Sequence, residues 1–531
     1  MKRLFSIFMV LVMLLSLSAC GGSEAPPEQE DQPVQDQPEK EPSEETLPPV
    51  MEEEDSVVPL QLMMGTGYLS EWDENYNELC TASWDALVLR EEDAKTYPKL
   101  ADALAELNDD QSVAATAFVQ EMLPYAEEAL ASNPEYFGGF TSNAAYTIQR
   151  ADNKILSIRV DGDEYTGGVH PNYGVYGVNI DPITGEKMEL TDILTDTEAI
   201  YPLLEEKLAE NYPEETFFGS LDELLQSYQP EDFGWTLGYQ GITFYFSPYD
   251  IAPYAAGLLT ATIWFDEMPS LFREEYITAP EGGYAMALLE WTPMEVDLKA
   301  GDGQRDTLSY AAYEGEYGSK ELTLTLNGVD YPEETWVAFD MTPYLVCTGE
   351  RFWLYVEARI ENDYRIVYIY DLNGDAPELV SEFSGAGFAG RWDESAGVDG
   401  IYYYDVLTNP ADFALGSICH LLGTKTAVRD YSVNPEDGTL VPVTEEYRFN
   451  EGQVAIVSAV PLDVTILPGN KSETLPAGTE FVCLRTDNES WVDLRLTDGR
   501  ECRIEIVEVD YTPTINGIPE WDCFVDLMYA G

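Results

Sequence analysis

The chain has 531 residues, of which 45% are hydrophobic and 12% aromatic, and its formal net charge is −72 at pH 7. This composition is typical of a folded protein of several domains and excludes an intrinsically disordered chain. The negative field excludes nucleic acid and anionic lipid as partners and favours cationic ones, mainly by raising the rate of encounter. The simpler explanation, that the acidity only keeps an exported protein soluble, stays open.

The first twenty residues predict export and lipid attachment. Lys2 and Arg3 precede the apolar run Leu4–Leu17, which is short for a membrane span and has the length of a signal-peptide core. The next residues, Leu17-Ser-Ala-Cys20, resemble the lipobox of bacterial lipoproteins, in which cleavage leaves Cys20 as a lipid-modified N-terminus. The resemblance implies attachment by lipid to the extracytoplasmic face of the cell membrane. An ordinary signal peptide with a chance cysteine is the alternative.

Residues 21–60 are rich in Glu, Pro, Gln and Asp and predict a solvated linker. Residues 61–285 predict an α+β domain, because helical patterns and strand pairs follow each other without a regular β-α-β alternation. Apolar residues at helical spacing run through 97–107 and 114–122, and Pro124 and Pro134 are expected to end this helical region. Strand pairs are expected at 141–149 with 154–160 and at 241–247 with 259–265, and Thr195–Glu198 has the pattern of a capping box.

Beyond residue 285 the helical patterns become rare. Residues 286–453 contain short strand patterns that predict an all-β domain, either a sandwich or a few propeller-like blades. Residues 454–531 contain five short strand patterns, a Leu475-Pro-Ala-Gly478 turn and a central Trp491-Val492 pair. This last region loosely resembles a bacterial SH3-like barrel, a type of domain attached to many cell-wall proteins. A generic small β-barrel is equally compatible with the pattern.

Two separated motifs carry a family resemblance. The first runs through Tyr165-Thr-Gly-Gly-Val-His170, Tyr176-Gly-Val-Asn-Ile-Asp181 and Thr184-Gly185, and the second is Ile242-Thr-Phe-Tyr-Phe246 with Pro248-Tyr-Asp-Ile-Ala-Pro-Tyr-Ala-Ala-Gly257. With them, residues 79–268 resemble the RsiV-like extracellular domain. That family includes the lysozyme-binding part of membrane anti-sigma factors and a module attached to a peptidoglycan deacetylase. The resemblance implies a binding module, since neither a sigma-binding segment nor a metal-dependent deacetylase domain is recognisable in this sequence.

The first motif predicts a turn and a strand. Gly167 and Gly168 supply the backbone freedom of a tight turn, Asp181 and Gly185 bracket a second turn, and Tyr165 and Thr166 complete the family pattern. His170 could carry a proton or bind a metal, but a structural hydrogen bond is the stronger expectation, because no His or Cys lies at ligand spacing. Asp161, Asp163 and Glu164 form an acidic group that could meet a basic partner or end a solvated hairpin.

The second motif contains the best candidates for partner binding. Tyr249 and Tyr254 are framed by Pro248 and Pro253, so that two aromatic rings lie on a stiff connection between two strands. Alternatively, both tyrosines pack back onto the domain.

Catalytic, metal and cofactor sites are not predicted. A Ser-His-Asp set would need His170 or His420, and neither lies near a nucleophile-elbow sequence. The cysteines after Cys20 form no C-x-x-C pair; export permits disulfides among them, for example Cys483 with Cys502, and buried thiols are the alternative. These cysteines are Cys80, Cys347, Cys419, Cys483, Cys502 and Cys523.

The sequence therefore predicts a non-enzymatic, lipid-anchored envelope protein without metal or cofactor. Its expected partner is a cationic protein such as lysozyme. The alternative is a peptidoglycan-binding or wall-modifying lipoprotein that uses the SH3-like end.

Overall fold

The computed structural model describes residues 56–135, 137–299, 304–315, 320–337, 339–361, 364–393, 400–449 and 455–529. Cys20 and nearly all of the predicted linker lie outside these residues. The described part is mostly β with few helices, which confirms a β-rich α+β fold. Among its helices, none is both long and apolar enough to span a membrane.

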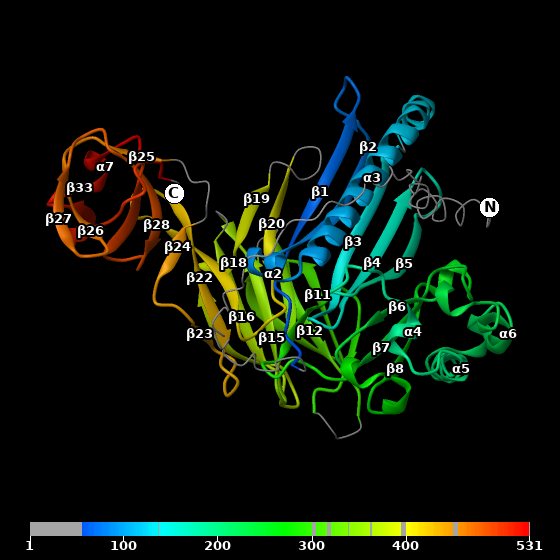
Figure 1. Ribbon diagram of the computed structural model, residues 1–531. Helices are drawn as coiled ribbons and strands as arrows, with labels where there is room; N and C mark the ends of the chain where they lie inside the picture. Colours follow the sequence, from blue (N-terminus) through cyan, green and yellow to red (C-terminus); the bar gives the residue numbers. More distant parts are fainter. Residues whose placement is uncertain are drawn as a thin grey trace, which may run out of the picture. The chain divides into compact units, whose positions relative to one another are not determined.

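A seven-stranded sheet forms the centre of the predicted α+β domain (Figure 1), and it contains two strands from the predicted all-β region. Its order is β19-β20-β1-β2-β3-β4-β5. The strands are β1 (Leu62–Trp72), β2 (Glu78–Leu89), β3 (Phe140–Ala151), β4 (Leu156–Tyr165), β5 (Asn172–Ile180), β19 (Gly390–Asp393) and β20 (Ile401–Val406). Hydrogen bonds thus cross the division predicted at residues 285 and 286, since β1 pairs with β20 over Leu62–Gly65.

Parallel strands need a long crossover connection, and the one between β2 and β3 is helical. It consists of α2 (Glu91–Thr96) and the long α3 (Pro98–Ser132). The expectation that Pro124 ends the helix is wrong: α3 continues through Pro124 to Ser132, and Asn133 is its C-cap residue. A proline inside a helix removes one hydrogen bond and crowds the carbonyl four residues earlier, and burial of Phe118, Val119 and Ala126 against the sheet offsets this cost on both sides.

A second half of the α+β domain has its own core. It contains α4 (Leu190–Ile193), α5 (Ile200–Asn211), α6 (Leu221–Leu225) and the antiparallel sheet β6-β7-β8, formed by Gly234–Leu237, Gly241–Phe246 and Leu259–Trp264. The capping box expected at Thr195 is wrong. The helix begins after Ala199, and the Thr195 hydroxyl instead donates to the carbonyl oxygens of Ser270 and Leu271 at 2.9 and 3.1 Å.

The two halves meet where β6 crosses β5. The Asn179 amide donates to the Trp235 carbonyl at 2.9 Å, and the Ser157 hydroxyl donates to Asn179 while accepting the Leu237 amide. Gly177 faces the same carbonyl: a Cβ at this position would lie 1.7 Å from the Trp235 oxygen. Glycine is therefore required here for the two backbones to approach, which gives the Tyr176–Asp181 motif a structural function.

The middle of the chain forms stacked antiparallel sheets. One has the order β17-β16-β15-β14-β9, and another has the order β10-β11-β12-β13. Their strands are β9 (Tyr284–Ala287), β10 (Met294–Val296), β11 (Asp306–Glu314), β12 (Lys320–Leu326), β13 (Val329–Val337), β14 (Asp340–Thr348), β15 (Arg351–Arg359), β16 (Arg365–Asp371) and β17 (Glu378–Ser384).

Strand β15 shows why these sheets stack. Leu354 and Val356 point into a core shared with β11 and β12, whereas Trp353 and Tyr355 point into the core shared with the seven-stranded sheet. Both faces of β15 are buried, so the strand is almost continuously apolar. This region is thus continuous with the α+β domain through a common core.

The remaining strands belong to a twelve-stranded sheet and a small three-stranded one. The first contains β18 (Ala386–Phe388), β21 (Phe413–Cys419), β22 (Lys425–Val433), β23 (Leu440–Pro442), β24 (Tyr447–Phe449), β25 (Ile456–Ser458), β26 (Leu462–Leu467), β27 (Lys471–Leu475), β28 (Glu480–Thr486), β29 (Trp491–Leu496), β30 (Glu501–Glu505) and β34 (Phe524–Val525); the second contains β31 (Val507–Val509), β32 (Thr512–Ile515) and β33 (Ile518–Pro519), followed by α7 (Glu520–Cys523). Among the described strands, β28-β29-β30-β26-β27 run in an open order without barrel closure, so the SH3-like architecture stays a prediction.

All six described cysteines are free and buried. Cys483 on β28 and Cys502 on β30 both lie opposite Leu494 of β29, one on each side. Two strand spacings of about 4.8 Å put their Cα atoms near 10 Å apart, which is too far for a disulfide. Burial raises the pKa of the Cys483 thiol to about 11.

We expect Gly177→Ala to lower the free energy of unfolding by about 1–3 kcal/mol or more, because the new methyl group meets a backbone carbonyl that cannot move freely. Gly162→Ala on β4 is the matched control, since its Cβ would meet no atom closer than 3.9 Å. Urea unfolding of both variants measures the difference. Equal midpoints would contradict the close approach of β5 and β6.

We expect all six described thiols to resist a chromogenic disulfide reagent in the native protein and to react together in denaturant, because burial blocks access and disfavours the thiolate. A Cys20→Ser background restricts the count to these six residues. Fewer than six reactive thiols after denaturation without reductant would reveal a disulfide and contradict the structure.

Candidate functional site

The candidate binding segment Pro248–Gly257, here called the Pro-Tyr loop, joins β7 to β8 and is held by its own backbone. The Tyr249 amide donates to the Ala252 carbonyl at 2.9 Å, and the Asp250 carboxylate accepts the Ser247 amide at 2.8 Å. Ile251 and Ala252 are buried in the core of the second half. With these anchors, the Tyr249 ring lies on the surface, and 50% of the residue is exposed.

The Pro-Tyr loop meets the turn between β4 and β5, so the structure brings the two sequence motifs together. The rings of His170 and Tyr254 stack, with centroids 3.7 Å apart and planes inclined by 19°. The Tyr254 hydroxyl donates to the Pro171 carbonyl at 3.1 Å, and His170 Nδ1 lies 2.9 Å from the same oxygen. Tyr249 is the next ring, 5.9 Å from Tyr254.

These residues form one surface, which we call the loop platform and define as Val169, His170, Tyr249 and Tyr254. The two tyrosines differ. Tyr254 packs back onto the turn, whereas Tyr249 faces solvent. Val169 is fully exposed beside them. A rigid platform with exposed aromatic and aliphatic surface can serve as an anchor in a protein interface, at little cost in side-chain entropy.

The other residues of the first motif shape the turns at the two ends of β5. Gly167 has a φ of +83°, followed by Gly168 in the exposed turn, and Tyr165 and Thr166 lie at the end of β4. Asp181 accepts the amides of Ile183 and Thr184 at 2.7 and 3.0 Å. Gly185 has a φ of +70°, and a Cβ there would lie 2.5 Å from the Lys99 carbonyl oxygen of α3.

Two carboxylates of the acidic group, Asp161 and Asp163 on β4, are hydrogen-bonded to other side chains of the domain. Asp161 accepts two hydrogen bonds from Arg159, at 2.8 and 2.6 Å, and a third from the Tyr173 hydroxyl at 3.1 Å. Asp163 accepts from the Asn143 amide. Burial, helped by the Asp161 charge, raises the pKa of Tyr173 to about 12, so this phenol remains a donor at neutral pH.

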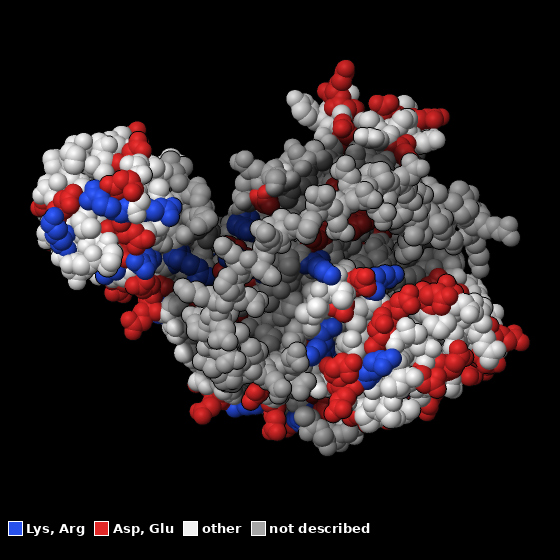
Figure 2. Space-filling view, in the orientation of Figure 1, with Lys and Arg blue, Asp and Glu red and all other residues white. Residues whose placement is uncertain are grey.

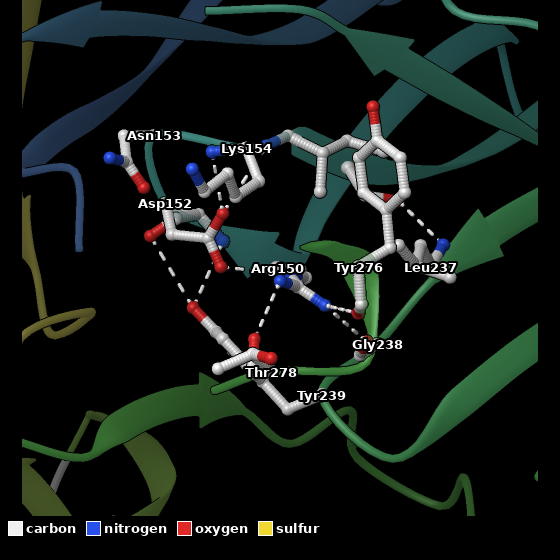
Figure 3. Close-up of polar contacts among 12 residues, drawn as sticks. Arg150, Asp152, Asn153, Lys154, Leu237, Gly238, Tyr239, Tyr276 and Thr278 are labelled. Carbon is white, nitrogen blue, oxygen red and sulfur yellow. Dashed lines mark hydrogen bonds and ion pairs between the residues drawn. The ribbon is translucent and has the colours of Figure 1, made fainter. Parts of the chain in front are cut away.

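The most deeply buried ion pair is one that the sequence interpretation missed (Figure 3). Arg150 and Asp152 have fully buried side chains, and Arg150 Nε donates to Asp152 at 2.7 Å. The two other nitrogens of Arg150 donate to the carbonyls of Tyr276 and Thr278, at 2.5 and 3.0 Å. The guanidinium also lies 5.2 Å from the centre of the Tyr239 ring. The only signal in the sequence was an Arg-x-Asp pattern at the end of an apolar strand.

The role of this pair is structural. Asp152 uses its second oxygen to accept the amides of Lys154 and Ile155, so both charges are satisfied by groups of the protein. His420, the second histidine, lies far along the chain on an exposed turn beside Thr424. Across the described residues, no three His, Cys, Asp or Glu side chains gather as a metal site would require.

A shallow pocket of about 330 Å³ lies beside the Asp181–Gly185 turn. It is lined by charged residues of both signs, including Glu186, Lys187, Asp192 and Arg273. Its walls are mostly polar, which differs from the apolar enclosure of a typical small-molecule site.

Comparisons with known proteins match two adjoining parts of the chain. Residues 94–173 match the family model described as deacetylase PdaC, and residues 191–266 match the family described as protein of unknown function, DUF3298. A DUF3298 family member from Bacteroides fragilis has 21% sequence identity and a TM-score of 0.32, with 41% of this chain and 96% of that chain covered. A DUF3298 family protein from Pseudomonas aeruginosa PAO1 has 18% identity and a TM-score of 0.28, with coverages of 42% and 98%. The comparison with curated proteins finds no match.

We expect Asp152→Asn to lower the free energy of unfolding by about 3–5 kcal/mol, because it leaves the Arg150 charge buried without its counter-charge. Glu91→Gln is the control: it removes one partner of the exposed Lys95 pair and should leave the urea midpoint unchanged. Equal midpoints for the two variants would show that Arg150 is not held as the structure describes.

Proposed function

We propose that this protein is a non-enzymatic binding protein of the cell envelope, attached to the membrane by lipid at Cys20, and that its RsiV-like domain binds lysozyme or another cationic wall-active protein. The observation that carries the proposal is the loop platform. The two motifs of the RsiV-like resemblance, which lie apart in the chain, meet there through His170 and Tyr254 and present Tyr249, Val169 and His170 to solvent.

The surface charge supports a cationic partner. In the second half of the domain, α4 to α6 and their connections carry exposed carboxylates with Lys207 as the one basic residue between 190 and 232. Figure 2 shows acidic side chains gathered over this region. They are Asp192, Asp196, Glu198, Glu205, Glu206, Glu210, Glu214, Glu215, Asp222, Glu223, Glu231 and Asp232.

This acidic surface adjoins the platform. The Phe218 amide, which follows Glu214 and Glu215, donates to the carbonyl of Ile251 in the Pro-Tyr loop at 3.0 Å. Phe218 itself is half exposed. A cationic protein would be attracted by the carboxylates and anchored by the rings, which are two separable contributions to binding.

The matched families support an extracytoplasmic binding module. The PdaC match covers α3 and the strands β3 and β4 with their connections, and the DUF3298 match covers the second half of the domain. The proposal includes no deacetylase activity, because the residues matched to PdaC form the sheet and helix that support the platform.

The alternative is peptidoglycan binding or wall modification by the SH3-like end. Exposed aromatic residues at Tyr511, in the turn between β31 and β32, and at Trp521, on α7, favour it. The loop platform gives the cationic-protein proposal the stronger support, because it combines aromatic anchors with a complementary charge.

We expect the purified protein to bind hen lysozyme, with an affinity that falls steeply between about 0.01 M and 0.15 M salt, because the acidic surface is screened. Tyr249→Ala should weaken binding about tenfold at both salt concentrations. Tyr125→Ala is the matched control, an exposed tyrosine on α3. Calorimetric titration measures all three proteins.

Absence of binding at low salt would refute the proposed partner. Binding that depends on salt but is equally strong in Tyr249→Ala and Tyr125→Ala would show that the acidic surface alone acts, and would remove the platform from the proposal.

A further inference from the structure

The seven-stranded sheet has two faces of different chemistry. On one face Ala82, Trp84 and Phe140 pack with Phe118 and Val119 of α3, and Figure 1 shows α3 lying across β2 and β3. Because side chains alternate along a strand, the intervening residues point to the opposite face. Farther along β4 and β5 this opposite face is covered by the second half of the domain, and on β1 and β2 it continues into the buried residues Leu62, Leu87 and Leu89. We call the part between them, which carries Tyr68, Ser83, Asn143 and Asp163 with their neighbours on β1 to β4 and β20, the polar face.

The strand registers align one row of side chains across the polar face. Tyr68 pairs with Ser83, Ser83 with Asn143, Asn143 with Asp163, and Asp163 with Tyr173. At about 4.8 Å for each strand spacing, the row is about 19 Å long. It thus places hydroxyl, amide and carboxylate groups in a line between two phenol rings.

Hydrogen bonds hold this row in place. The Ser83 hydroxyl donates to Asn143 Oδ1 at 2.8 Å, and the Asn143 amide donates to Asp163 Oδ2 at 3.1 Å. In the neighbouring row, the Thr66 hydroxyl donates to Asp85 Oδ1 at 2.7 Å. The carboxylate oxygens retain further lone pairs that can accept hydrogen bonds from a ligand.

Aromatic rings border the polar rows along β1 and β20. Tyr68 and Trp72 are 53% and 51% exposed, and Tyr402 and Tyr404 are 41% and 37% exposed, with their ring centroids 4.7 Å apart. A Cβ on Gly390 would lie 2.3 Å from the Tyr402 ring. The ring therefore lies close against the backbone of β19 and offers a flat surface.

We propose that the polar face binds a strand of a neutral polysaccharide made of β-linked pyranose units. The C–H faces of pyranose rings pack on exposed aromatic rings, and their hydroxyl or acetamido groups exchange hydrogen bonds with Asn143, Asp163 and Asp85. Anionic polymers are repelled by these carboxylates and by the net charge of −72.

The composition of the face favours a glycan over a protein. Protein interfaces have an apolar centre. Here the residues between the rings are polar, namely Thr66, Ser70, Thr81, Ser83 and Thr141. The aromatic residues of this face, Tyr68 and Trp72, lie on β1, whereas Val169 and His170 of the loop platform follow β4, so the two surfaces can be altered separately.

The test uses the full chain and three named probes: N-acetylglucosamine hexamer, cellohexaose and a hyaluronan fragment. We expect binding of at least one neutral hexamer and none of hyaluronan. Tyr68→Ala and Trp72→Ala should each weaken binding about five- to tenfold, and Tyr249→Ala, on the loop platform, should leave it unchanged. The double variant Tyr511→Ala Trp521→Ala tests whether the SH3-like end contributes to glycan binding.

Loss of glycan binding only in the Tyr511 and Trp521 variant would move the site to the C-terminal end and overturn the proposal. So would absence of binding to both neutral hexamers, or equal binding by all variants. If Tyr68→Ala and Trp72→Ala instead weaken lysozyme binding while no glycan binds, the face contacts a protein. The lysozyme titration with Tyr249→Ala is independent, so either proposal can fail alone.

Discussion

The buried ion pair between Arg150 and Asp152 is the interaction on which the arrangement of the α+β domain depends. Removing two charges from water is costly, and the pair is stable only because every nearby donor and acceptor is occupied. Those partners come from distant parts of the chain: the end of β3, the Tyr276–Thr278 segment and the aromatic ring of Tyr239. The pair therefore joins the end of β3 to the segment after β8 and to Tyr239 in the second half of the domain.

Packing between the two halves also creates the candidate binding surface. Gly177 allows β6 to cross β5 at backbone distance, and Asn179 links to the Trp235 carbonyl at the crossing. The same crossing brings the end of β7, and with it the Pro-Tyr loop, beside the turn that carries His170. The stack of His170 on Tyr254 is thus a consequence of packing several residues away. Neither motif forms the platform by itself.

Local sequence patterns predicted a large part of the secondary structure. The pairs expected at 141–149 with 154–160 and at 241–247 with 259–265 are β3 with β4 and β7 with β8. Two local rules were overridden by tertiary contacts. Pro124 lies inside α3 because the sheet stabilises the helix on both sides, and Thr195 bonds to Ser270 and Leu271 because these carbonyls lie within reach.

The sequence by itself determined the residue types of the platform and the need for glycine at its turns, because φ preferences and aromatic surface are properties of single residues. It also determined the acidity that favours a cationic partner. Only the tertiary structure decided that β20 pairs with β1, that Arg150 is buried, and that Tyr68, Ser83, Asn143 and Asp163 align across four strands. Such contacts join residues far apart in the chain, and periodicity within one segment carries no information about which distant segment will lie beside it.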